Sequence, residues 1–223
     1  MNQEAHALIS ATEKFVKSHC SADATGHDWF HANRVRNMAL RIGRAEKADL
    51  LIIELAALLH DVDDWKLVGR SEVTASRRIR GFLESVAALS CETADHICEI
   101  IQTLSFKGAG MASPMRTIEG KIVQDADRLD ALGAIGIART FAYGGAQGRL
   151  LYDPAIPPTL HKNSDAYRNS TAPTLNHFYE KLFLLKDRMN TDPARKIAEE
   201  REGFMKEFVE RFLDEWNFGG PCS

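Results

Sequence analysis

The sequence lacks the features that would assign the chain to a membrane, to secretion or to a nucleic acid. It has no apolar run of about 18 residues or more, the length a helix needs to cross a bilayer. The segment from Met1 to Ala5 has neither the basic nor the apolar region of a signal peptide. With 31 acidic and 28 basic residues the net charge is −3, so no basic excess attracts nucleic acid broadly. We expect a cytosolic protein with no membrane partner, no broad nucleic-acid binding and a local site for any anionic ligand.

Cysteine is also scarce. The four cysteines in 223 residues form no Cys-x-x-Cys pair, which excludes a disulfide scaffold and a cysteine-rich structural zinc site. We interpret them as reduced thiols. Hydrophobic residues make up 44% of the chain and charged residues 26%, which is typical of a globular protein. The length favours a single domain over residues 1–223.

Alternation of apolar and polar residues, the mark of half-buried strands, is missing as well. Apolar residues recur at intervals of three and four, which predicts an all-α fold. The segment 48–61 is apolar on almost every side and should lie in the middle of a helical bundle. An apolar stripe on the last helix includes Phe204, Phe208 and Phe212. The predicted helices cover residues 3–19, 29–46, 48–61, 71–88, 92–106, 117–143 with a break near Gly133, 174–189 and 194–216.

Residues 144–173 show no sustained periodicity and contain four of the seven prolines. We expect a long loop here, packed with the C-terminal helices of residues 174–217 on a core of residues 20–145. Loops of this length are often lids or binding segments, although an inert surface excursion explains the composition equally well.

Histidine and aspartate recur at interior positions of the predicted helices. His31 shares a helical face with Val35 and Ile42, which directs its imidazole inward. Taken alone, a histidine at such a position is more often a hydrogen-bonded core residue than a ligand. The buried helix then ends in His60 and Asp61. Because a buried carboxylate without a partner is costly, Asp61 needs a cation, a donor network or a metal.

A third group lies on the predicted helix 117–143. It contains Asp125, Asp127 and Asp130 among apolar residues, and Asp127 and Asp130 share a face. Two imidazoles and two carboxylates that reach one interior from different helices would form a divalent-metal site. Nitrogen and oxygen donors suit Mn, Fe, Ni, Zn or Mg.

The order of His31, the adjacent His60 and Asp61, and Asp127 within Ala-Asp-Arg-Leu resembles the H…HD…D signature of the HD-domain metal-dependent phosphohydrolases. Two longer blocks, residues 26–35 and 122–136, are similar to the small bacterial YedJ/YpgQ-like HD hydrolases. The first reads Gly-His-Asp-Trp-Phe-His-Ala-Asn-Arg-Val.

The resemblance implies an all-α fold and one divalent cation (Mn, Ni, Co, Fe, Mg or Zn). The cation would be held by His31, His60, Asp61 and Asp127, with Asp127 preferred to Asp125 because it occupies the Asp of Ala-Asp-Arg-Leu. The implied enzyme hydrolyses a small phosphorylated metabolite, expected to be a nucleotide. Relatives carry His-Ser-Phe where this chain has Leu104-Ser105-Phe106. Leucine cannot ligate, which argues against a second metal and against an oxygen-using two-iron enzyme.

Asp64 is the expected general acid or base. It follows His60 by four residues, where related hydrolases carry an acidic residue; a solvated acidic turn is the alternative. His27, one helical turn before His31, is expected to shuttle a proton or hold substrate, and a capping or surface role is the alternative.

Three cations are candidates for binding the substrate phosphate, namely Arg34, Lys66 and Lys107. The alternative for each is a solvated surface charge. The competing function for the whole chain is a catalytically silent HD module that binds a nucleotide or a partner protein. All four predicted ligands are present, which argues against that reading. The sequence leaves room for a homodimer.

Overall fold

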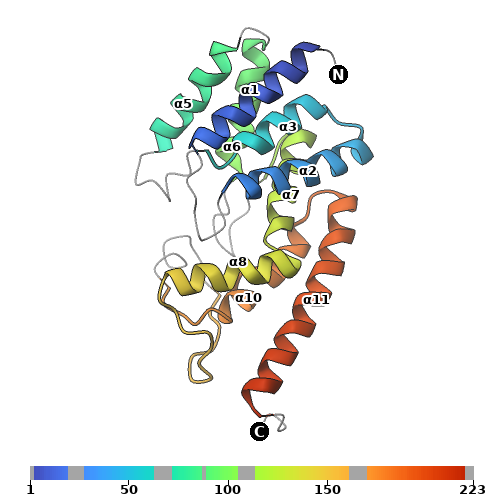
Figure 1. The fold of residues 1–223 in the computed structure, drawn as a ribbon. Helices are drawn as coiled ribbons and strands as arrows, with labels where there is room; N and C mark the ends of the chain where they lie inside the picture. The colour runs from blue at the N-terminus through green and yellow to red at the C-terminus, as the bar shows by residue number, and fades with distance from the viewer. Residues whose placement is uncertain are drawn as a thin grey trace. The chain divides into compact units, whose positions relative to one another are not determined.

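The computed structural model describes residues 3–19, 28–62, 72–86, 89–104, 114–160 and 170–218. Every regular element in these residues is helical, which confirms the all-α prediction (Figure 1). None of the described helices is long and apolar enough to cross a membrane. The chain forms two compact units that divide between Asp127 and Arg128. The single domain expected over residues 1–223 stays a prediction.

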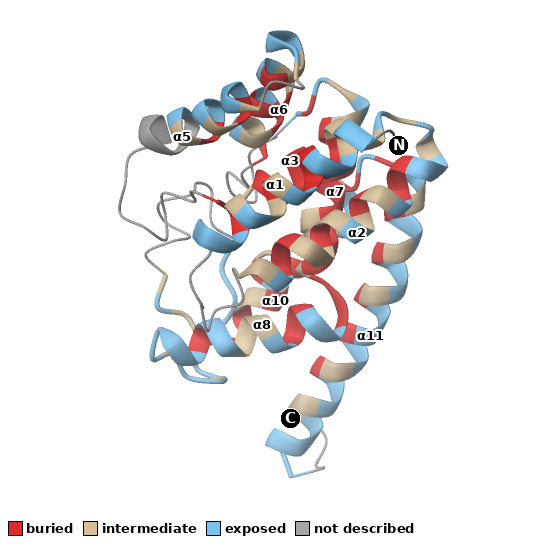
Figure 2. Cartoon of the chain, turned by 45° about the horizontal axis from the view of Figure 1, so that its top comes forward, coloured by how far each residue is buried: buried red, intermediate tan, exposed pale blue. Residues whose placement is uncertain are grey.

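A central apolar helix organises the first unit. This helix, α3 (Leu50–Leu59), contacts α1 (Gln3–His19), α2 (Trp29–Glu46) and α6 (Cys91–Thr103). Its residues 53–59 are therefore buried on every side (Figure 2). The prediction that this segment lies in the middle of a bundle is therefore confirmed. The helices of the first unit are α1 (Gln3–His19), α2 (Trp29–Glu46), α3 (Leu50–Leu59), α5 (Glu72–Ser85), α6 (Cys91–Thr103) and α7 (Ile118–Asp130), the last as far as Asp127.

Aspartate caps define where α2 and α3 begin. The first amides of a helix lack intrahelical partners, and an aspartate side chain before the first turn accepts their hydrogen bonds. The Asp28 carboxylate accepts from the amide of His31 at 2.9 Å. The Asp49 carboxylate accepts from Leu51 at 2.9 Å and from Ile52 at 3.2 Å. Both helices thus start close to the positions that the sequence predicted.

Arg36 joins three helices of this unit. Its guanidinium, on α2, lies 2.5 Å from the Glu13 carboxylate on α1 and 3.2 Å from the Glu54 carboxylate on α3. The Glu54 side chain is only 5% exposed. Burial raises the pKa of Glu54, while the nearby Arg36 charge opposes that rise. The charge of Arg36 therefore offsets part of the cost of burying the Glu54 carboxyl group.

The second unit contains the helix break predicted near Gly133. Helix α7 ends at Asp130 and α8 begins at Gly133, whose φ of 73° lies in the left-handed region that glycine adopts freely. Gly136 is also required, since a Cβ there would lie 2.2 Å from the carbonyl oxygen of Ala131. The elements of this unit are α8 (Gly133–Ala146), α10 (Asn176–Glu180), the 3-10 helices η1 (Leu182–Leu184) and η2 (Lys186–Arg188), and α11 (Asp192–Trp216).

The prediction of a single helix over residues 174–189 is wrong. Helix α10 stops at Lys181, whose φ of −141° and ψ of −55° are not helical, and two 3-10 turns follow. Leu182, Leu185 and Met189 are nonetheless buried. The error arises because 3-10 turns repeat every three residues and so bury apolar residues spaced by three or four as an α-helix does.

Two smaller expectations also need correction. Helix α8 continues through Ala146, so the non-helical segment begins after the predicted residue 144. Phe204 on α11 is 50% exposed and is not part of the buried stripe. Met205, which belongs to the predicted stripe, is buried, and so is Ala198. Phe208 and Phe212 join a cluster of rings around Phe141, with centroids 5.9 and 6.1 Å from it.

Candidate metal centre

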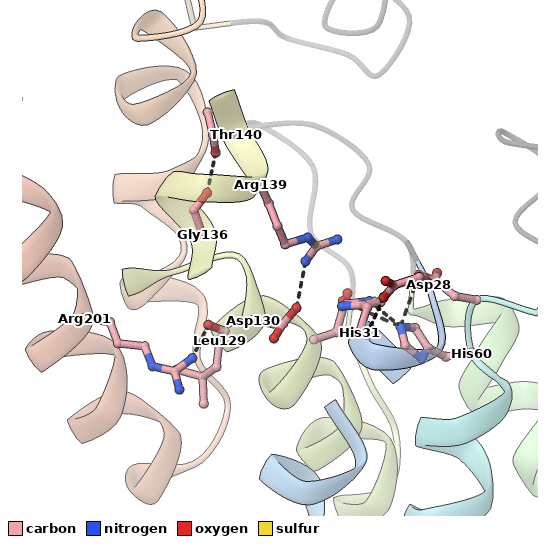
Figure 3. A network of polar contacts seen from close by, with 11 residues as sticks. Asp28, His31, His60, Leu129, Asp130, Gly136, Arg139, Thr140 and Arg201 are labelled. Atoms are coloured by element: carbon pink, nitrogen blue, oxygen red, sulfur yellow. Dashed lines mark hydrogen bonds and ion pairs between the residues drawn. The ribbon is translucent and has the colours of Figure 1, made fainter. Parts of the chain in front are cut away.

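His31 lies in the first turn of α2 and faces the interior of the first unit. Val35 and Ile42 on the same face are also buried, and the His31 side chain is 1% exposed. The prediction that this imidazole points inward is therefore confirmed. The Asp28 cap holds the backbone amide of the same residue (Figure 3).

His60 lies at the end of α3, where the chain leaves the buried helix. Its side chain is 3% exposed. The ring Nδ1 lies 2.8 Å from the carbonyl oxygen of Ala57. A carbonyl oxygen can only accept, so Nδ1 carries the proton and donates. The other nitrogen, Nε2, then offers its lone pair to the centre of the cluster, which is how metal-binding histidines are commonly oriented.

Two carboxylates complete the group. Asp61 follows His60 and is 17% exposed at its side chain. Asp127 comes from the last part of α7 that belongs to the first unit, and its side chain is 38% exposed. The cluster is therefore closed on the histidine side and open toward solvent at Asp127.

The donor atoms converge on one point. His31 Nε2 lies 3.2 Å from His60 Nε2, 3.2 Å from Asp61 Oδ2 and 3.5 Å from Asp127 Oδ1. His60 Nε2 lies 3.7 Å from each of the same two oxygens. Ligands about 2.0 to 2.2 Å from one divalent ion are themselves about 3 to 3.5 Å apart. The spacing and the nitrogen and oxygen chemistry of these atoms therefore fit a divalent cation.

The electrostatics of the cluster favour a cation as well. Burial would lower the pKa of His60, but Asp61 and Asp127 outweigh it and raise that pKa to about 10. Burial would raise the pKa of Asp127, but its hydrogen bond to His60 and the His60 charge lower it. Without a metal, a proton on His60 offsets part of the charge of the two carboxylates. A divalent ion would take the place of that proton and balance both carboxylates while the ring is neutral.

The other carboxylates of α7 have different surroundings. Asp130, which was predicted to share a face with Asp127, forms an ion pair with Arg139 at 2.9 Å (Figure 3). Asp125 is fully buried and is not in the donor group formed by His31, His60 and Asp127. Asp127 belongs to that group, and the choice of Asp127 over Asp125 as a metal ligand stays a prediction.

Several predicted site residues fall where the structure describes nothing. His27, Asp64, Lys66 and Lys107 lie outside the described residues, and their roles stay predictions. Arg34 is described and half-buried on α2, and its role in phosphate binding also stays a prediction. Leu104 follows α6 and is buried, with a side chain that cannot bind a metal.

Two hydrogen bonds that support the predicted ligands, one at Asp28 and one at His60 Nδ1, were not predicted from the sequence. The cap at Asp28 could have been found, because aspartate directly before a helix start is a common capping signal. The bond from His60 Nδ1 to Ala57 had no signal in the sequence, since it depends on the ring orientation at the end of α3.

Comparisons with known proteins place this arrangement in a family. A family model for the HD domain matches residues 29–132, which contain all four predicted ligands. YpgQ of Bacillus subtilis (strain 168) is 43% identical over 196 residues, covering 87% of this chain and 87% of that protein. The chain belongs to the HD-domain family.

Solved structures agree with this assignment. A protein of Lactobacillus plantarum matches the HD-domain chain with a TM-score of 0.84 at 36% identity, covering 97% of this chain and 99% of that one. An HD-superfamily hydrolase of Bacillus thuringiensis matches with a TM-score of 0.75 at 47% identity, covering 96% and 98%. YpgQ of Bacillus subtilis in complex with ADP gives 0.71 at 37% identity, covering 93% and 96%. The predicted enzyme class, a metal-dependent phosphohydrolase of the HD superfamily, is confirmed for this HD-domain chain.

Proposed function

We propose that the protein hydrolyses the phosphate groups of a nucleotide at one divalent cation held by His31, His60, Asp61 and Asp127. The observation that carries the proposal is the spacing of the donor atoms: the two imidazole nitrogens lie 3.2 Å apart, and each lies 3.2 to 3.7 Å from an oxygen of Asp61 and an oxygen of Asp127. The ADP complex of the related YpgQ supports a nucleotide as the ligand. The native metal is one of Mn, Ni, Co, Fe, Mg and Zn, with Mn as our first choice.

Hydrolysis of a phosphate ester or anhydride needs a nucleophile at neutral pH and neutralisation of the phosphoryl charge. A bound divalent ion would supply both, by lowering the pKa of its water to about 7 and by polarising the phosphoryl group. His60 serves the site by donating from Nδ1 to Ala57, which keeps Nε2 directed at the cluster. The greater exposure of Asp127 leaves one side of the centre accessible to substrate.

Proton transfer and phosphate binding fall to residues near the cluster in the sequence. We assign the general acid or base to Asp64 and a proton shuttle or substrate contact to His27. Arg34, Lys66 and Lys107 would bind the substrate phosphates, because guanidinium and ammonium groups donate charge-assisted hydrogen bonds to phosphate oxygens. A cytosolic location, a single domain and a homodimer remain part of the proposal.

Substitution of the adjacent pair tests the ligand assignment. We expect His60→Ala and Asp61→Ala each to lose metal-dependent phosphate release and the bound metal. The measurement is phosphate and pyrophosphate release from a panel of nucleotides, with Mn, Ni, Co, Mg or Zn supplied to metal-stripped protein, beside elemental analysis of each variant. Full metal-dependent turnover in either variant would overturn the assignment. Tight nucleotide binding without turnover by the wild-type protein under every metal would instead favour the silent binding module.

A further inference from the structure

We propose that Asp28 is a positioning residue of the metal centre, acting through the hydrogen bond that its carboxylate accepts from the backbone amide of His31. The proposal rests on the proposed function, because it assumes that His31 holds a cation. The N–O distance is 2.9 Å, and Figure 3 shows Asp28 beside the two imidazoles. The backbone carbonyl of Asp28 also accepts from the amide of Ala32 at 3.2 Å. Asp28 therefore holds two successive amides, one of which belongs to the ligand residue.

The position of His31 within α2 makes this cap unusually important for the site. His31 lies in the first turn, where an amide has no intrahelical acceptor and the chain frays if it is not capped. Its ring is 1% exposed and faces donor atoms 3.2 to 3.5 Å away. A small movement of the first turn would carry Nε2 out of ligand distance. The carboxylate of Asp28 opposes that movement at the residue concerned.

Helix α3 provides a matched control. Asp49 caps α3 as Asp28 caps α2, with its carboxylate accepting from the amides of Leu51 and Ile52. The ligand on α3, however, is His60, which lies at the opposite end of that helix. Loss of the Asp49 cap should weaken the helix start without releasing a ligand. Comparing variants of the two aspartates therefore distinguishes an effect on helix stability from an effect on the position of a ligand.

The experiment compares Asp28→Ala, Asp28→Asn, Asp28→Ser and Asp49→Ala in the full-length protein. Each is stripped of metal and titrated calorimetrically with Mn²⁺. A second titration with Co²⁺ is followed by visible absorption, because the Co²⁺ bands report ligand geometry.

We expect Asp28→Ala to weaken Mn²⁺ binding about 10-fold or more, as loss of a supporting contact typically does, and to change the Co²⁺ bands. Asp28→Asn and Asp28→Ser should bind like the wild type, because both residues cap helices well. Asp49→Ala should bind like the wild type while its metal-free Tm falls about as far as that of Asp28→Ala.

Three results would overturn the proposal. The first is wild-type Mn²⁺ affinity and unchanged Co²⁺ bands in Asp28→Ala. The second is an equal loss of affinity in Asp49→Ala, which would show that any lost cap weakens the site. The third is a loss of Mn²⁺ affinity in Asp28→Asn equal to that in Asp28→Ala. It would show that the negative charge of Asp28 matters and not its hydrogen bond to the His31 amide. Failure of the wild-type protein itself to bind metal would refute the proposed function, and this inference with it.

Discussion

At the scale of single residues, His60 shows how the site separates the roles of two ring nitrogens. Nδ1 donates to the Ala57 carbonyl at 2.8 Å, and Nε2 faces His31 Nε2 at 3.2 Å. Two imidazole nitrogens this close need a proton or a cation between them, because their lone pairs would otherwise repel. The pKa of His60 is raised to about 10 in the metal-free protein, which agrees with a proton at this position.

The two aspartates on α7 give a residue-scale prediction. We expect Asp127→Asn to weaken metal binding by a factor of about 100 or more, because a neutral amide replaces an anionic ligand and loss of a contact that only supports a ligand already costs about 10- to 100-fold. We expect Asp130→Asn to bind metal normally. It should instead lower the free energy of unfolding by about 2 kcal/mol, because it weakens a hydrogen bond between two charged groups.

Metal titration and urea unfolding of both variants check this prediction. The pair forms a matched control, since each substitution replaces an aspartate by an asparagine on the same helix. Normal metal binding by Asp127→Asn, or loss of metal from Asp130→Asn, would show that the assignment of the two carboxylates is wrong.

At the scale of elements, the Arg36 guanidinium links the helix that carries His31 to the helix that carries His60. It bridges Glu13 and Glu54 at 2.5 and 3.2 Å, and Glu54 is nearly inaccessible to solvent. Removing one partner of a buried ion pair leaves an uncompensated charge in the interior, which costs more than the pair itself contributes. The link should therefore be essential to the packing of α1, α2 and α3.

We predict that Arg36→Met lowers the free energy of unfolding by about 3 to 5 kcal/mol at pH 8, and by less at pH 5. The folded pKa of Glu54 is already raised above its ordinary 4.5 by burial, and losing Arg36 raises it further. A carboxyl group with a raised folded pKa costs stability as the pH rises above its unfolded pKa, because only the unfolded chain ionises freely. At pH 5, only slightly above the unfolded pKa of 4.5, most of that cost is gone, and below pH 4.5 it disappears because the group is protonated in both states.

Urea unfolding at both pH values measures this difference. Arg41→Met is the control, because Arg41 lies exposed on the same helix and its loss should change stability by no more than about 0.5 kcal/mol. An Arg36→Met variant whose loss of stability is the same at pH 5 and pH 8 would contradict the role given to Glu54.

At the scale of the whole molecule, the positions of most helices could be predicted because their apolar residues follow the helical period. The α3 core and the break at Gly133 are clear cases. Residues 174–189 could not be predicted, since α and 3-10 turns bury the same spacing of leucines. The exposure of Phe204 could not be predicted either, because it depends on what α11 packs against.

Some features of the candidate site could likewise be predicted from the sequence and others could not. His31, His60, Asp61 and Asp127 could be selected from the sequence, because imidazoles and carboxylates on core helices are costly without partners. Their mutual distances could not, since these depend on how α2, α3 and α7 pack. The proton on His60 Nδ1 could not be predicted either, because it follows from the carbonyl of Ala57.

Metal dependence of phosphate release is the central claim, and a stepwise metal titration tests it most directly. Metal-stripped protein receives Mn²⁺ while bound metal and phosphate release from a nucleotide are both measured. We predict that activity is absent without metal and rises in parallel with binding, up to one ion per chain at the group formed by His31, His60 and Asp127, with Asp61 beside it. Undiminished phosphate release from the metal-stripped protein, or saturation with Mn²⁺ that produces no hydrolysis of any nucleotide, would contradict the account.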